Sequence, residues 1–454
     1  MIDYIRQRIQ DKRVLILGFG REGQSTLKLF LEAGTAAQLA VGDQKQLTVE
    51  DVGSAEIRLC CGQDYQSYMD DYDMVMKSPG IVLERDITEY DTEIVSQMQL
   101  MFEFYRDRII GITGTKGKST TTTLLYHIMK EAGMPVILAG NIGIPVFDIV
   151  HDIKEDSLLV LELSCHQLEY MTVSPKWGIL LNIYEEHLDH YGTLEKYVAS
   201  KEKIYVNQKQ EDTLYVHPSV APVDGTCMGM QKLVDLVNIN SENAKDVAVK
   251  LRDKQICYGN RAISIPTDKI SLLGAHNYLD IAFVYAVCCD FGIGDDVFLQ
   301  GLQSYVPLPH RLQYIGCVDG VCYYDDSIST IDETTIQALN TIENADTVLI
   351  GGMERDISYA NLEKYLSESK VAHIILMEAT GKRIYQEIMD NLPDFRDKER
   401  LYLVEHLEDA VRVAKDITEK GCSCILSPAA ASYGIFKNFE ERGDVFQKLV
   451  LGEK

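Results

Sequence analysis

The chain is short of basic residues for its size. Of its 454 residues, 44 are Lys or Arg and 69 are Asp or Glu, so the formal net charge is −25. General nucleic-acid binding needs a basic face, and this charge balance argues against it. An anionic small-molecule substrate is still allowed, because local lysines, arginines and helix ends determine the potential inside a site.

Long apolar runs and targeting signals are absent as well. No stretch of 18 or more apolar residues occurs, although 46% of the residues are hydrophobic and can form sizeable cores. The N-terminal sequence MIDYIRQR lacks the apolar core of a signal peptide. We therefore expect a cytoplasmic protein with no membrane insertion.

Cysteine is present, but not in the spacing of a metal site. The eleven cysteines form only three close groups, Cys60-Cys61, Cys288-Cys289 and Cys422-Ser-Cys424, and none has zinc-binding spacing. Without a secretory signal, we expect the cysteines to be reduced and mostly buried. Sequence repeats are also absent, and the length suggests about three domains.

The most informative stretch is Gly111-Ile-Thr-Gly-Thr-Lys-Gly-Lys-Ser-Thr120. An apolar segment that predicts a buried strand precedes it, and a helical pattern follows over residues 121–130. At such a junction, backbone N–H groups and the helix dipole can hold phosphates, Lys118 can reach the β- and γ-phosphates, and Ser119 can bind Mg²⁺. The strict phosphate-loop pattern requires glycine where Ile112 stands, so a glycine-rich turn with a surface lysine is the alternative. We favour nucleoside triphosphate binding.

A second glycine turn lies near the N-terminus. Gly18, Gly20 and Gly23 form a GxGxxG turn between a predicted strand and helix, and Asp43 ends the next strand twenty residues later. This fingerprint indicates a nucleotide with a pyrophosphate, such as NAD or a UDP-sugar, whose ribose binds the carboxylate. A tight structural turn is the alternative. The loop at residues 77–80 also follows a strand, at the end where ligands bind parallel sheets.

Three further polar residues accompany the central apolar strands. Glu162 lies among aliphatic residues in a predicted strand, where metal binding or a positive partner would offset the cost of burial. His187 follows the next strand in an acidic loop and is either a Mg²⁺ or Mn²⁺ ligand or a capping histidine. Lys201 and Lys203 lie on a predicted helix at residues 194–205, and by sequence alone they are solvated lysines.

The last third of the chain alternates strands with helices. A hairpin is predicted around Asp319-Gly320, and strands are predicted at residues 347–350, 373–376 and 424–426. This alternation predicts a second doubly wound sheet. Residues 206–268 carry no clear pattern.

Six motifs in this order resemble the Mur ligases, the ATP-dependent enzymes that add amino acids in peptidoglycan synthesis. The motifs are Thr113-Gly-Thr-Lys-Gly-Lys-Ser-Thr120, Gly140-Asn-Ile-Gly143, Leu161-Glu-Leu-Ser164, Asn182 with His187-Leu-Asp189, Gly274-Ala-His-Asn277 and Pro309-His-Arg311. The resemblance covers nearly the whole chain. The Rossmann-like start, the segment 163–169 and the tail 426–443 are similar to the branch of the family that adds D-glutamate to UDP-N-acetylmuramoyl-L-alanine.

The resemblance implies an α/β fold of three domains. These are a Rossmann-like domain for the UDP substrate at residues 1–106, a central P-loop ATPase-like domain with a parallel sheet at residues 107–307, and a C-terminal Rossmann-like domain for glutamate at residues 308–454. It further implies ATP as co-substrate, an acyl-phosphate intermediate, two Mg²⁺ or Mn²⁺ sites and a monomeric protein.

The resemblance also assigns residues to each site. It places ATP at Gly114, Thr115, Lys116, Gly117, Lys118, Ser119, Thr120, Asn277, Asp280, Arg311 and Asp326, with His276 beside the adenine. It places the UDP substrate at Gly20, Arg21, Glu22, Asp43, Lys45, Gly80 and Asn141. It places glutamate at Thr330, Arg355, Ser432, Tyr433 and Phe439, and metal at Ser119, Glu162, His187 and a carbamylated Lys201. Lys118, His187, Lys201 and Arg311 would be catalytic. The structural alternatives are an exposed loop arginine for Arg355 and a helix N-cap for Ser432.

Three positions depart from the branch's pattern. Ile328 replaces a lysine, Lys116 stands where asparagine is common, and Asp280 stands where a second asparagine is expected. We hypothesise that Lys116 supplies the charge that Ile328 removes. These departures leave the handedness of the glutamate open.

Four alternatives remain at this point. A ligase that adds L-glutamate to the same nucleotide is one, and a folate-polyglutamating ligase is another, although such enzymes begin at the ATP domain. A nicotinamide-dependent oxidoreductase would leave Lys118 and Lys201 unexplained. A non-catalytic nucleotide-binding regulator would not need Glu162 or His187.

Overall fold

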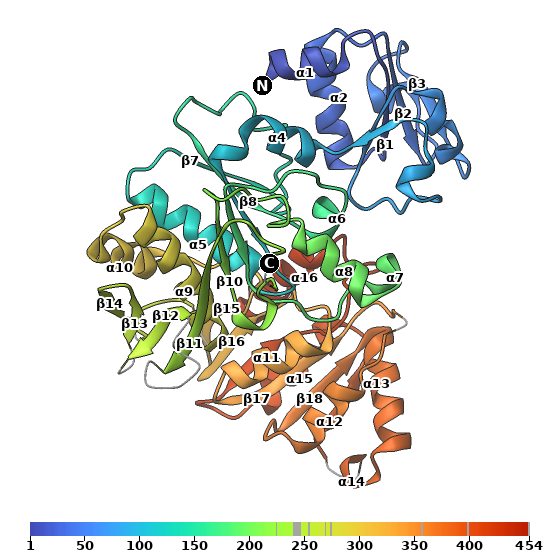
Figure 1. Cartoon of the computed structure of the whole chain (residues 1–454). Coiled ribbons are helices and arrows are strands. Elements are labelled where there is room, and N and C mark those ends of the chain that lie inside the picture. The colour runs from blue at the N-terminus through green and yellow to red at the C-terminus, as the bar shows by residue number, and fades with distance from the viewer. Residues whose placement is uncertain are drawn as a thin grey trace. The chain divides into compact units, whose positions relative to one another are not determined.

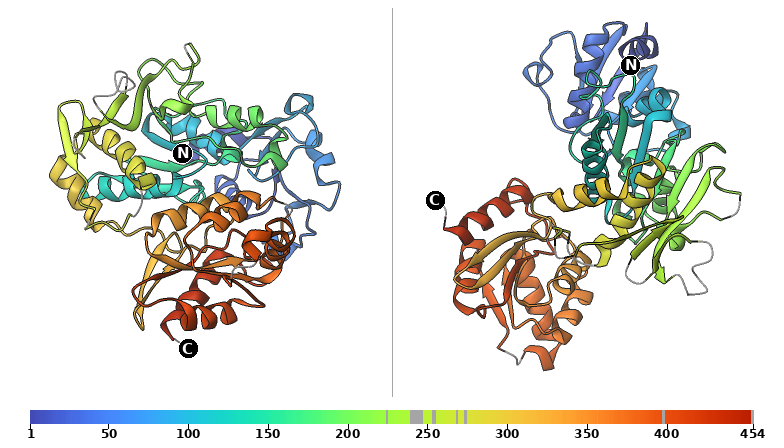
Figure 2. Two further views of the ribbon diagram at one scale, coloured as in Figure 1. Left: turned by 90° about the horizontal axis from the view of Figure 1, so that it is seen from below. Right: turned by 90° about the vertical axis from the view of Figure 1, so that its left-hand side faces the viewer.

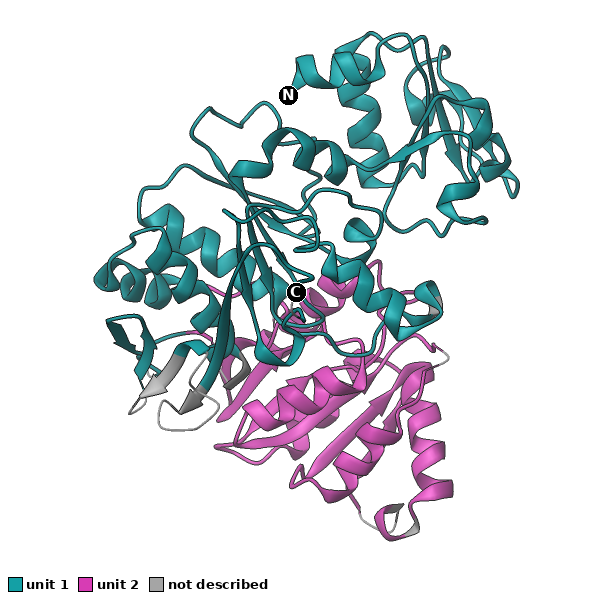
Figure 3. Cartoon of the chain, viewed as in Figure 1, with its two compact units in different colours: residues 1–270, 276–305 teal, residues 271–275, 306–454 magenta. Residues whose placement is uncertain are grey.

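The structure is a computed structural model that describes residues 1–223, 225–238, 247–252, 255–267, 269–272, 275–355, 357–396 and 399–452. It divides into two compact units (Figure 3). Unit 1 comprises residues 1–270 and 276–305, and unit 2 comprises residues 271–275 and 306–454. Each of the three predicted α/β regions contains one sheet, so the predicted fold class is confirmed.

The first sheet of unit 1 is parallel and has the strand order β3-β2-β1-β4-β5 (Figure 1). Its strands are β1 Arg13–Leu17, β2 Gln38–Asp43, β3 Arg58–Cys61, β4 Met74–Lys77 and β5 Glu93–Val95. The helices of this part are α1 Ile2–Ile9, α2 Arg21–Ala33, α3 Val49–Val52 and α4 Gln97–Tyr105, with 3₁₀ turns at Tyr65–Asp71, Ile87–Glu89 and Arg106–Arg108. The strand order reverses at β1 and β4, which places the carboxyl end of β1 at the point where such sheets bind ligands.

The second sheet of unit 1 has nine strands in the order β14-β13-β12-β11-β10-β9-β6-β8-β7. Its strands are β6 Ile109–Thr113, β7 Val136–Gly140, β8 Leu158–Glu162, β9 Trp177–Leu180, β10 Thr213–Val216, β11 Met230–Asn238, β12 Val247–Arg252, β13 Gln255–Tyr258 and β14 Arg261–Ser264. The strands from β7 to β12 are parallel, whereas β13 and β14 pair antiparallel at the edge. Five of these strands fall in residues 206–268, where the sequence carried no clear pattern.

Helices of the central region flank this sheet. They are α5 Lys118–Glu131, α6 Cys165–Leu168, α7 Leu188–Tyr191, α8 Leu194–Glu202, α9 Ala275–Asp290 and α10 Asp295–Ser304, with a 3₁₀ turn at Pro218–Val220. The helix predicted at residues 194–205 is thus present, but it ends three residues earlier, at Glu202. None of the helices in the described ranges is long and apolar enough to cross a membrane.

One apolar core joins the two sheets of unit 1. It contains Val14 and Phe30 from the first sheet and its helices, Phe102 from α4, and Ile109 and Leu161 from the second sheet. Side chains of α4 are buried along most of the helix, so it links the two sheets. The boundary predicted at residue 106 therefore separates two sheets that share a core.

Unit 2 contains a six-stranded sheet with the order β15-β16-β20-β17-β18-β19. Its strands are β15 Gln313–Val318, β16 Val321–Asp325, β17 Ala345–Gly351, β18 His373–Met377, β19 Leu401–Val404 and β20 Ser423–Leu426. Its helices are α11 Asp332–Thr341, α12 Ala360–Glu368, α13 Glu378–Asn391, α14 Pro393–Arg396, α15 Leu407–Ile417 and α16 Phe439–Leu451. Only the β15–β16 pair is antiparallel among these strands, as the predicted hairpin requires.

Alternate side chains of the central strands enter two cores. Ile350 and Ile374 face one core with helices α11 to α13, whereas Leu349 and Ile375 face the other core with α15 and α16. Figure 2 shows these orange and red helices on the two faces of the sheet. Unit 2 therefore has the doubly wound arrangement that the sequence predicts.

The expectation that all cysteines are reduced is wrong for one pair. Cys317 and Cys322 stand opposite each other in the β15–β16 hairpin and form a disulfide. Cross-strand register brings their side chains together, and the sequence analysis considered only cysteines within two residues of each other. The other nine cysteines are free and are buried or half-buried.

Candidate functional site

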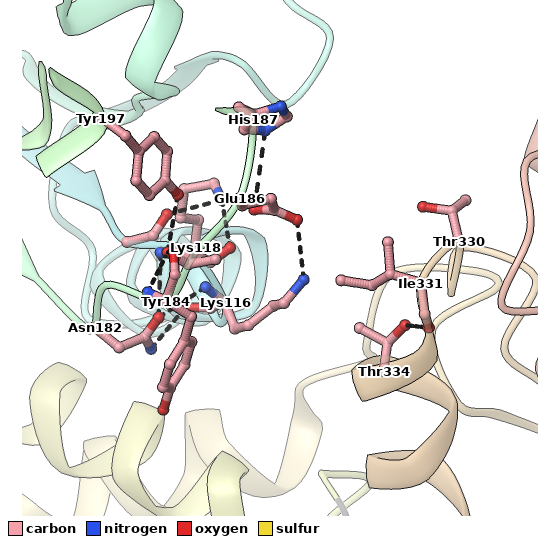
Figure 4. A network of polar contacts seen from close by, with 12 residues as sticks. Lys116, Lys118, Asn182, Tyr184, Glu186, His187, Tyr197, Thr330, Ile331 and Thr334 are labelled. Atoms are coloured by element: carbon pink, nitrogen blue, oxygen red, sulfur yellow. Dashed lines mark hydrogen bonds and ion pairs between the residues drawn. The ribbon is translucent and has the colours of Figure 1, made fainter. Parts of the chain in front are cut away.

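The phosphate loop is held by hydrogen bonds to the side chain of one asparagine, Asn182. The loop leaves β6 after Thr113, passes through Gly117 at a φ of 84°, and enters α5 at Lys118. The Asn182 Oδ1 atom accepts the backbone N–H groups of Thr115 at 3.1 Å and Lys116 at 2.8 Å. Asn182 Nδ2 in turn donates to the Lys116 carbonyl at 3.1 Å (Figure 4). Asn182 therefore fixes the shape of the loop.

The hydroxyl of Thr115 forms a second anchor for the loop. It accepts the Tyr184 N–H at 2.9 Å and lies 2.9 Å from the Tyr197 hydroxyl (Figure 4). Tyr197 is fully buried on α8. The loop is thus tied both to the chain after β9 and to α8, which explains how segments far apart in sequence reach one site.

Lys118 folds back onto its own loop. Its Nζ atom donates to the carbonyls of Gly114 at 3.0 Å and Thr115 at 2.9 Å. Burial lowers the pKa of Lys118, while the carboxylates of Glu162 and Glu186 act in the opposite direction. The ammonium group therefore lies in the loop, where phosphate oxygens can replace the two carbonyls.

The sequence-based reading of Lys201 as a solvated lysine is wrong. Its side chain is only 1% exposed, and its Nζ atom donates to the Gly114 carbonyl at 2.9 Å, the same oxygen that Lys118 binds. Burial, followed by the charge of Lys118, lowers the pKa of Lys201 to about 7. A buried amine with this pKa is about half in its neutral, nucleophilic form near pH 7.

Glu162 has the environment of a cation ligand. It ends β8 and is 2% exposed, and its Oε1 atom accepts the Asn141 side-chain amide at 2.8 Å. The Oε2 atom is buried and has no hydrogen-bond partner among the described residues. An orphaned carboxylate oxygen is costly unless a cation binds it. Glu162 therefore fits a Mg²⁺ ligand, and Ser119 in the first turn of α5 supplies a second oxygen donor of the kind Mg²⁺ prefers.

His187 starts the short helix α7 in a left-handed conformation, with a φ of 58°. Its Nε2 atom lies 3.9 Å from the Glu186 carboxylate, and its ring contacts the His166 ring at a centroid distance of 4.9 Å. The backbone takes the N-cap position of α7, but within the described residues the His187 ring caps no N–H group of that helix. The capping alternative is thereby weakened, and the metal role stays a prediction.

Of the departures from the family pattern, Lys116 lies on the phosphate loop and Asp280 packs against it. The Lys116 Nζ atom pairs with Glu186 Oε1 at 3.1 Å (Figure 4). Asp280 of α9 packs against Gly117 so closely that an added Cβ atom would lie 2.5 Å from its Oδ1 atom. Asp280 thus lies at the phosphate loop. Asn277 lies three residues earlier on α9, whereas Gly274 of the same motif and the side chain of His276 lie outside the described residues.

The N-terminal glycine turn is built around Asp43. Its Oδ2 atom accepts the Phe19 N–H at 2.7 Å and its Oδ1 atom accepts the Lys45 N–H at 2.8 Å. Gly18 has a φ of 90°, and a Cβ atom on Gly23 would lie 2.0 Å from the Gly18 carbonyl oxygen. Glycine is therefore required at both positions, and Asp43 holds the turn as well as being a candidate ribose ligand.

The predicted UDP-substrate residues lie where the two sheets of unit 1 meet. Glu22 accepts the Gln167 side-chain amide at 2.8 Å, and burial raises the pKa of Glu22. An added Cβ atom on Gly143 would lie 3.5 Å from the Arg21 guanidinium. Asn141, two residues before Gly143, binds Glu162 as described. The structure therefore brings Arg21, Glu22 and Asn141 to one junction, close to the candidate metal ligand.

In unit 2, two predicted glutamate ligands meet directly. Arg355 donates to the Thr330 carbonyl, and its side chain is half-buried, so the alternative of an exposed loop arginine is wrong. The Met353 N–H bonds the Ala431 carbonyl at 2.8 Å, which places Ser432 beside the segment that carries Arg355. Ser432 is 4% exposed.

The N-cap alternative for Ser432 is also wrong. Helix α16 starts at Phe439, and its N-cap is Asn438, whose side chain accepts the Glu441 N–H at 2.9 Å. Tyr433 is 61% exposed, whereas Phe439 binds the Ser327 hydroxyl through its carbonyl at 2.8 Å. Thr330, Arg355, Ser432 and Tyr433 thus occupy loops after β16, β17 and β20, whereas Phe439 is the first residue of α16.

The arginine that joins these loops was not predicted from the sequence. Arg442 is fully buried on α16 and donates to the Ser327 carbonyl at 2.8 Å and the Ala430 carbonyl at 3.0 Å. It lies within the tail motif at residues 426–443, which supplied the only signal for it. Asn182 was likewise part of a motif, but its role in shaping the phosphate loop required the structure.

Asp326 is buried inside unit 2 and fully engaged. Its carboxylate accepts the Ser329 hydroxyl at 2.5 Å, the Ser427 hydroxyl at 2.8 Å and the Leu312 N–H at 3.0 Å. Burial raises the pKa of Asp326 to about 6, against these hydrogen bonds and Arg311. Its position next to the Arg311 segment fits a residue that orients the loop. Contact of Arg311 and Asp326 with ATP stays a prediction.

Sequence and structure comparisons agree on the family. Residues 112–288 match the Mur ligase middle domain. The chain is 32% identical over 451 residues to the UDP-N-acetylmuramoylalanine–D-glutamate ligase of Geobacillus kaustophilus, and this match covers 96% of the chain and 97% of that protein. It is 30% identical over 462 residues to the protein of the same name from Acetivibrio thermocellus, with 98% and 97% covered.

Solved structures support the fold. The crystal structure of MurF ligase from Thermotoga maritima in complex with ADP has a TM-score of 0.60 at 16% identity, with 100% of both chains covered. The UDP-N-acetylmuramate–alanine ligase MurC from Thermotoga maritima has a TM-score of 0.59 at 18% identity, with 98% of this chain and 100% of that chain covered. The chain belongs to the Mur ligase family.

Proposed function

We propose that the protein joins D-glutamate to UDP-N-acetylmuramoyl-L-alanine in peptidoglycan precursor synthesis and converts ATP to ADP and phosphate. The full-length similarity to ligases of that name supports the substrates. The observation that carries the chemistry is the convergence of two lysines, the half-buried Lys118 and the buried Lys201, on the Gly114 carbonyl of a phosphate loop.

The proposed reaction has two steps. The terminal carboxylate of the UDP substrate attacks the γ-phosphoryl group of ATP, which forms an acyl phosphate and releases ADP. The amine of glutamate then attacks the acyl carbon, and collapse of the tetrahedral intermediate releases phosphate and leaves the amide. Charge spreads over the equatorial oxygens during phosphoryl transfer, so the protein contributes mainly position and positive charge.

Within this scheme, Lys118 is the cation for the β- and γ-phosphates. Its present acceptors are two carbonyls of its own loop, and a phosphate oxygen is a stronger, charged acceptor. The positive end of α5 adds to the same field. Asn182 holds two loop N–H groups, so it sets the shape of the cradle rather than contacting the phosphate.

The residues around Glu162 fit Mg²⁺. Glu162 Oε2, Ser119 and His187 would hold the cations together with Lys201 as a carbamate, and Mg²⁺ would supply neutralisation of phosphate charge. The orphaned Oε2 atom is the structural support for this assignment. The charge of Lys118 repels the protonated form of Lys201. Carbamylation converts the Lys201 amine into an anion, which suits a cation-rich site.

Glutamate recognition is assigned to unit 2. Arg355 would bind a carboxylate of glutamate in a bidentate manner, and Thr330, Ser432, Tyr433 and Phe439 would line the pocket. Arg442 and Asp326 hold the loops that carry these residues.

Phosphate release from ATP in the presence of UDP-N-acetylmuramoyl-L-alanine tests the proposal. D-glutamate, L-glutamate and no amino acid are compared. Release that depends on D-glutamate supports the proposal, and release with L-glutamate alone would move the specificity and direct attention to Ile328. The absence of release with either enantiomer, despite ATP binding, would contradict the proposal and favour a nucleotide-binding regulator.

A further inference from the structure

A cleft opens at the junction of the two sheets of unit 1, beside the candidate UDP-substrate residues. It is open to solvent, and the empty space in and in front of it amounts to about 340 Å³. Its walls are formed by Lys77, Pro79, Ile94, Val95, Ser96, Gln99, His166, Gln167 and Tyr170. The first six belong to strands β4 and β5, the residues that follow them, or α4, and the last three belong to α6 and the turn after it.

Lys77 is the only lysine or arginine among the residues that line the cleft. None of the nine lining residues is a carboxylate. The nearby carboxylates are engaged elsewhere, because Glu22 accepts Gln167 at 2.8 Å and Glu169 lies 3.2 Å from His190. The lining therefore contains one ammonium group and no carboxylate to pair with it.

That charge is poorly satisfied by the protein. Lys77 is 5% exposed, and its Nζ atom has only long contacts, 3.4 Å to the Ser78 carbonyl and 3.3 Å to the Pro79 carbonyl. An ammonium group has three donors, and normal N–H···O bonds measure about 2.7–3.2 Å. The Tyr170 ring, 5.2 Å from Nζ, adds a weak attraction. Burial lowers the pKa of Lys77 to about 8, against the charges of Glu169 and Glu22. A buried ammonium group with such weak contacts lowers the free energy of unfolding. Binding of an anionic ligand explains its presence better than a role in packing does.

The position of Lys77 indicates which anion it serves. It pairs in register with Leu17, the last residue of β1, directly before the glycine turn. The next residue, Ser78, donates its hydroxyl to the Gly18 carbonyl at 3.0 Å. That turn leads into α2, a 13-residue helix whose N-terminus is a suitable site for a pyrophosphate. Lys77 thus lies on the neighbouring strand, opposite the residue that precedes the turn expected to bind the diphosphate.

Resting on the proposed function, we propose that Lys77 is the cation that binds the diphosphate of the UDP substrate in this cleft. The resemblance to the Mur ligases did not assign Lys77 to the UDP-substrate site. The ammonium group would replace its two long carbonyl contacts with charged phosphate oxygens. The uracil and ribose would be bound by other residues, so Lys77 should discriminate between nucleotides by their phosphates.

Titration calorimetry with UDP and with uridine tests this assignment. We expect Lys77→Met to raise the Kd of UDP at least tenfold, the range for losing a hydrogen bond to a charged group, and to leave the Kd of uridine within twofold. Lys77→Arg keeps the charge and is expected to retain part of the affinity. The matched control is Lys28→Met, which removes an exposed lysine from α2 and should change neither Kd.

Thermal unfolding of the ligand-free variants provides a second readout. Because burial opposes the Lys77 charge, Lys77→Met should unfold at a temperature no lower than the wild type, which separates a lost ligand contact from a lost fold. Unchanged UDP affinity, or an equal loss for UDP and uridine, would overturn the assignment. If wild-type protein releases phosphate in a D-glutamate-dependent manner while Lys77→Met binds UDP normally, only the Lys77 assignment fails. If wild-type protein neither binds UDP nor releases phosphate, the proposed function fails too.

Discussion

At the scale of single residues, Lys201 carries the most specific chemistry of the site. Its buried amine, with a pKa lowered to about 7, is about half neutral at pH 7 and can react with CO₂ to give a carbamate and a proton. Removing CO₂ and bicarbonate should therefore lower ligase activity at least tenfold, and adding bicarbonate should restore it. Carbon-13 NMR with labelled bicarbonate should show a carbamate signal.

The control for Lys201 lies on the same segment. Lys201→Arg should lose the carbamate signal and the activity, whereas Lys203→Arg, at a half-buried position just past the end of α8, should keep both. Full activity of a CO₂-free preparation would exclude the carbamate.

Asp326 makes a prediction about stability and pH. Its native pKa is raised from 3.8 to about 6, because burial disfavours its charged form. Between pH 3.8 and about pH 6, Asp326 is therefore protonated in the native state but ionised in the unfolded chain. Its contribution to the free energy of unfolding is fully present at low pH and is lost as the pH rises through about 6. Relative to Asp326→Asn, wild-type protein should lose about 2 kcal/mol of unfolding free energy between about pH 4 and pH 7.

Urea unfolding of both proteins at several pH values measures this difference. Asn has no titration in this range, so the effects of other acids cancel when the two curves are subtracted. A flat difference would mean that Asp326 is ionised throughout and that its hydrogen bonds outweigh burial.

The residues also show what the sequence can and cannot provide. Lys118 and Glu162 were identified from local pattern, because a phosphate loop and an acid in an apolar strand are both visible within a few positions. The environment of Lys201 was not visible, since its burial depends on the Gly114 carbonyl, 87 positions away. Arg442 was missed for the same reason, as its acceptors lie up to 115 positions away.

At the scale of elements, the phosphate loop depends on Asn182, which follows β9. Replacing Asn182 by Ala removes two hydrogen bonds to loop N–H groups and one to a loop carbonyl. Each of the two hydrogen bonds to loop N–H groups contributes about 1 kcal/mol net to the stability of the loop shape that binds ATP. We therefore expect the KM for ATP to rise about 10- to 30-fold. Steady-state kinetics with varied ATP measure this change.

Asn182→Asp is the matched comparison, because it keeps both acceptor bonds and loses only the donor to the Lys116 carbonyl. Its effect on the KM for ATP should be smaller than that of Ala. UDP binding should be unchanged in both variants, since the predicted UDP residues do not contact Asn182 in the described structure. A KM for ATP equal to that of the wild type in Asn182→Ala would show that the loop keeps its shape without this anchor.

Elements were predictable where the pattern was strong. The strands that carry the site, β1, β6 and β8, are short apolar runs that are followed by a glycine or end in an acid, and all three were predicted. Strands β10 to β14 were missed. Four of them, β11 to β14, lie at or near the edge of the sheet and mix polar with apolar residues, and β10 is only four residues long. Edge strands are half-solvated, so their periodicity is weak.

At the scale of the whole molecule, the chain consists of two units with separate cores. Every residue assigned to the UDP substrate, including Lys77, lies in unit 1. A ligand stabilises the part of a protein to which it binds by RT ln(1 + [L]/Kd), about 2.7 kcal/mol at 100 times the Kd. We therefore expect UDP to raise the unfolding temperature of unit 1 and to leave that of unit 2 unchanged.

Calorimetry of the full chain with and without UDP tests this expectation, because units with separate cores can unfold in separate transitions. Peptide-resolved hydrogen exchange follows the two units separately. The peptide that contains Trp177, the single tryptophan, reports on unit 1, and the peptide that contains the Cys317–Cys322 disulfide reports on the β-hairpin of unit 2. Protection that rises around Trp177 and not in the hairpin would support a UDP site confined to unit 1. Equal protection of both regions would mean that the units unfold as one cooperative body, and the sequence-based division into independent substrate domains would then fail as a description of stability.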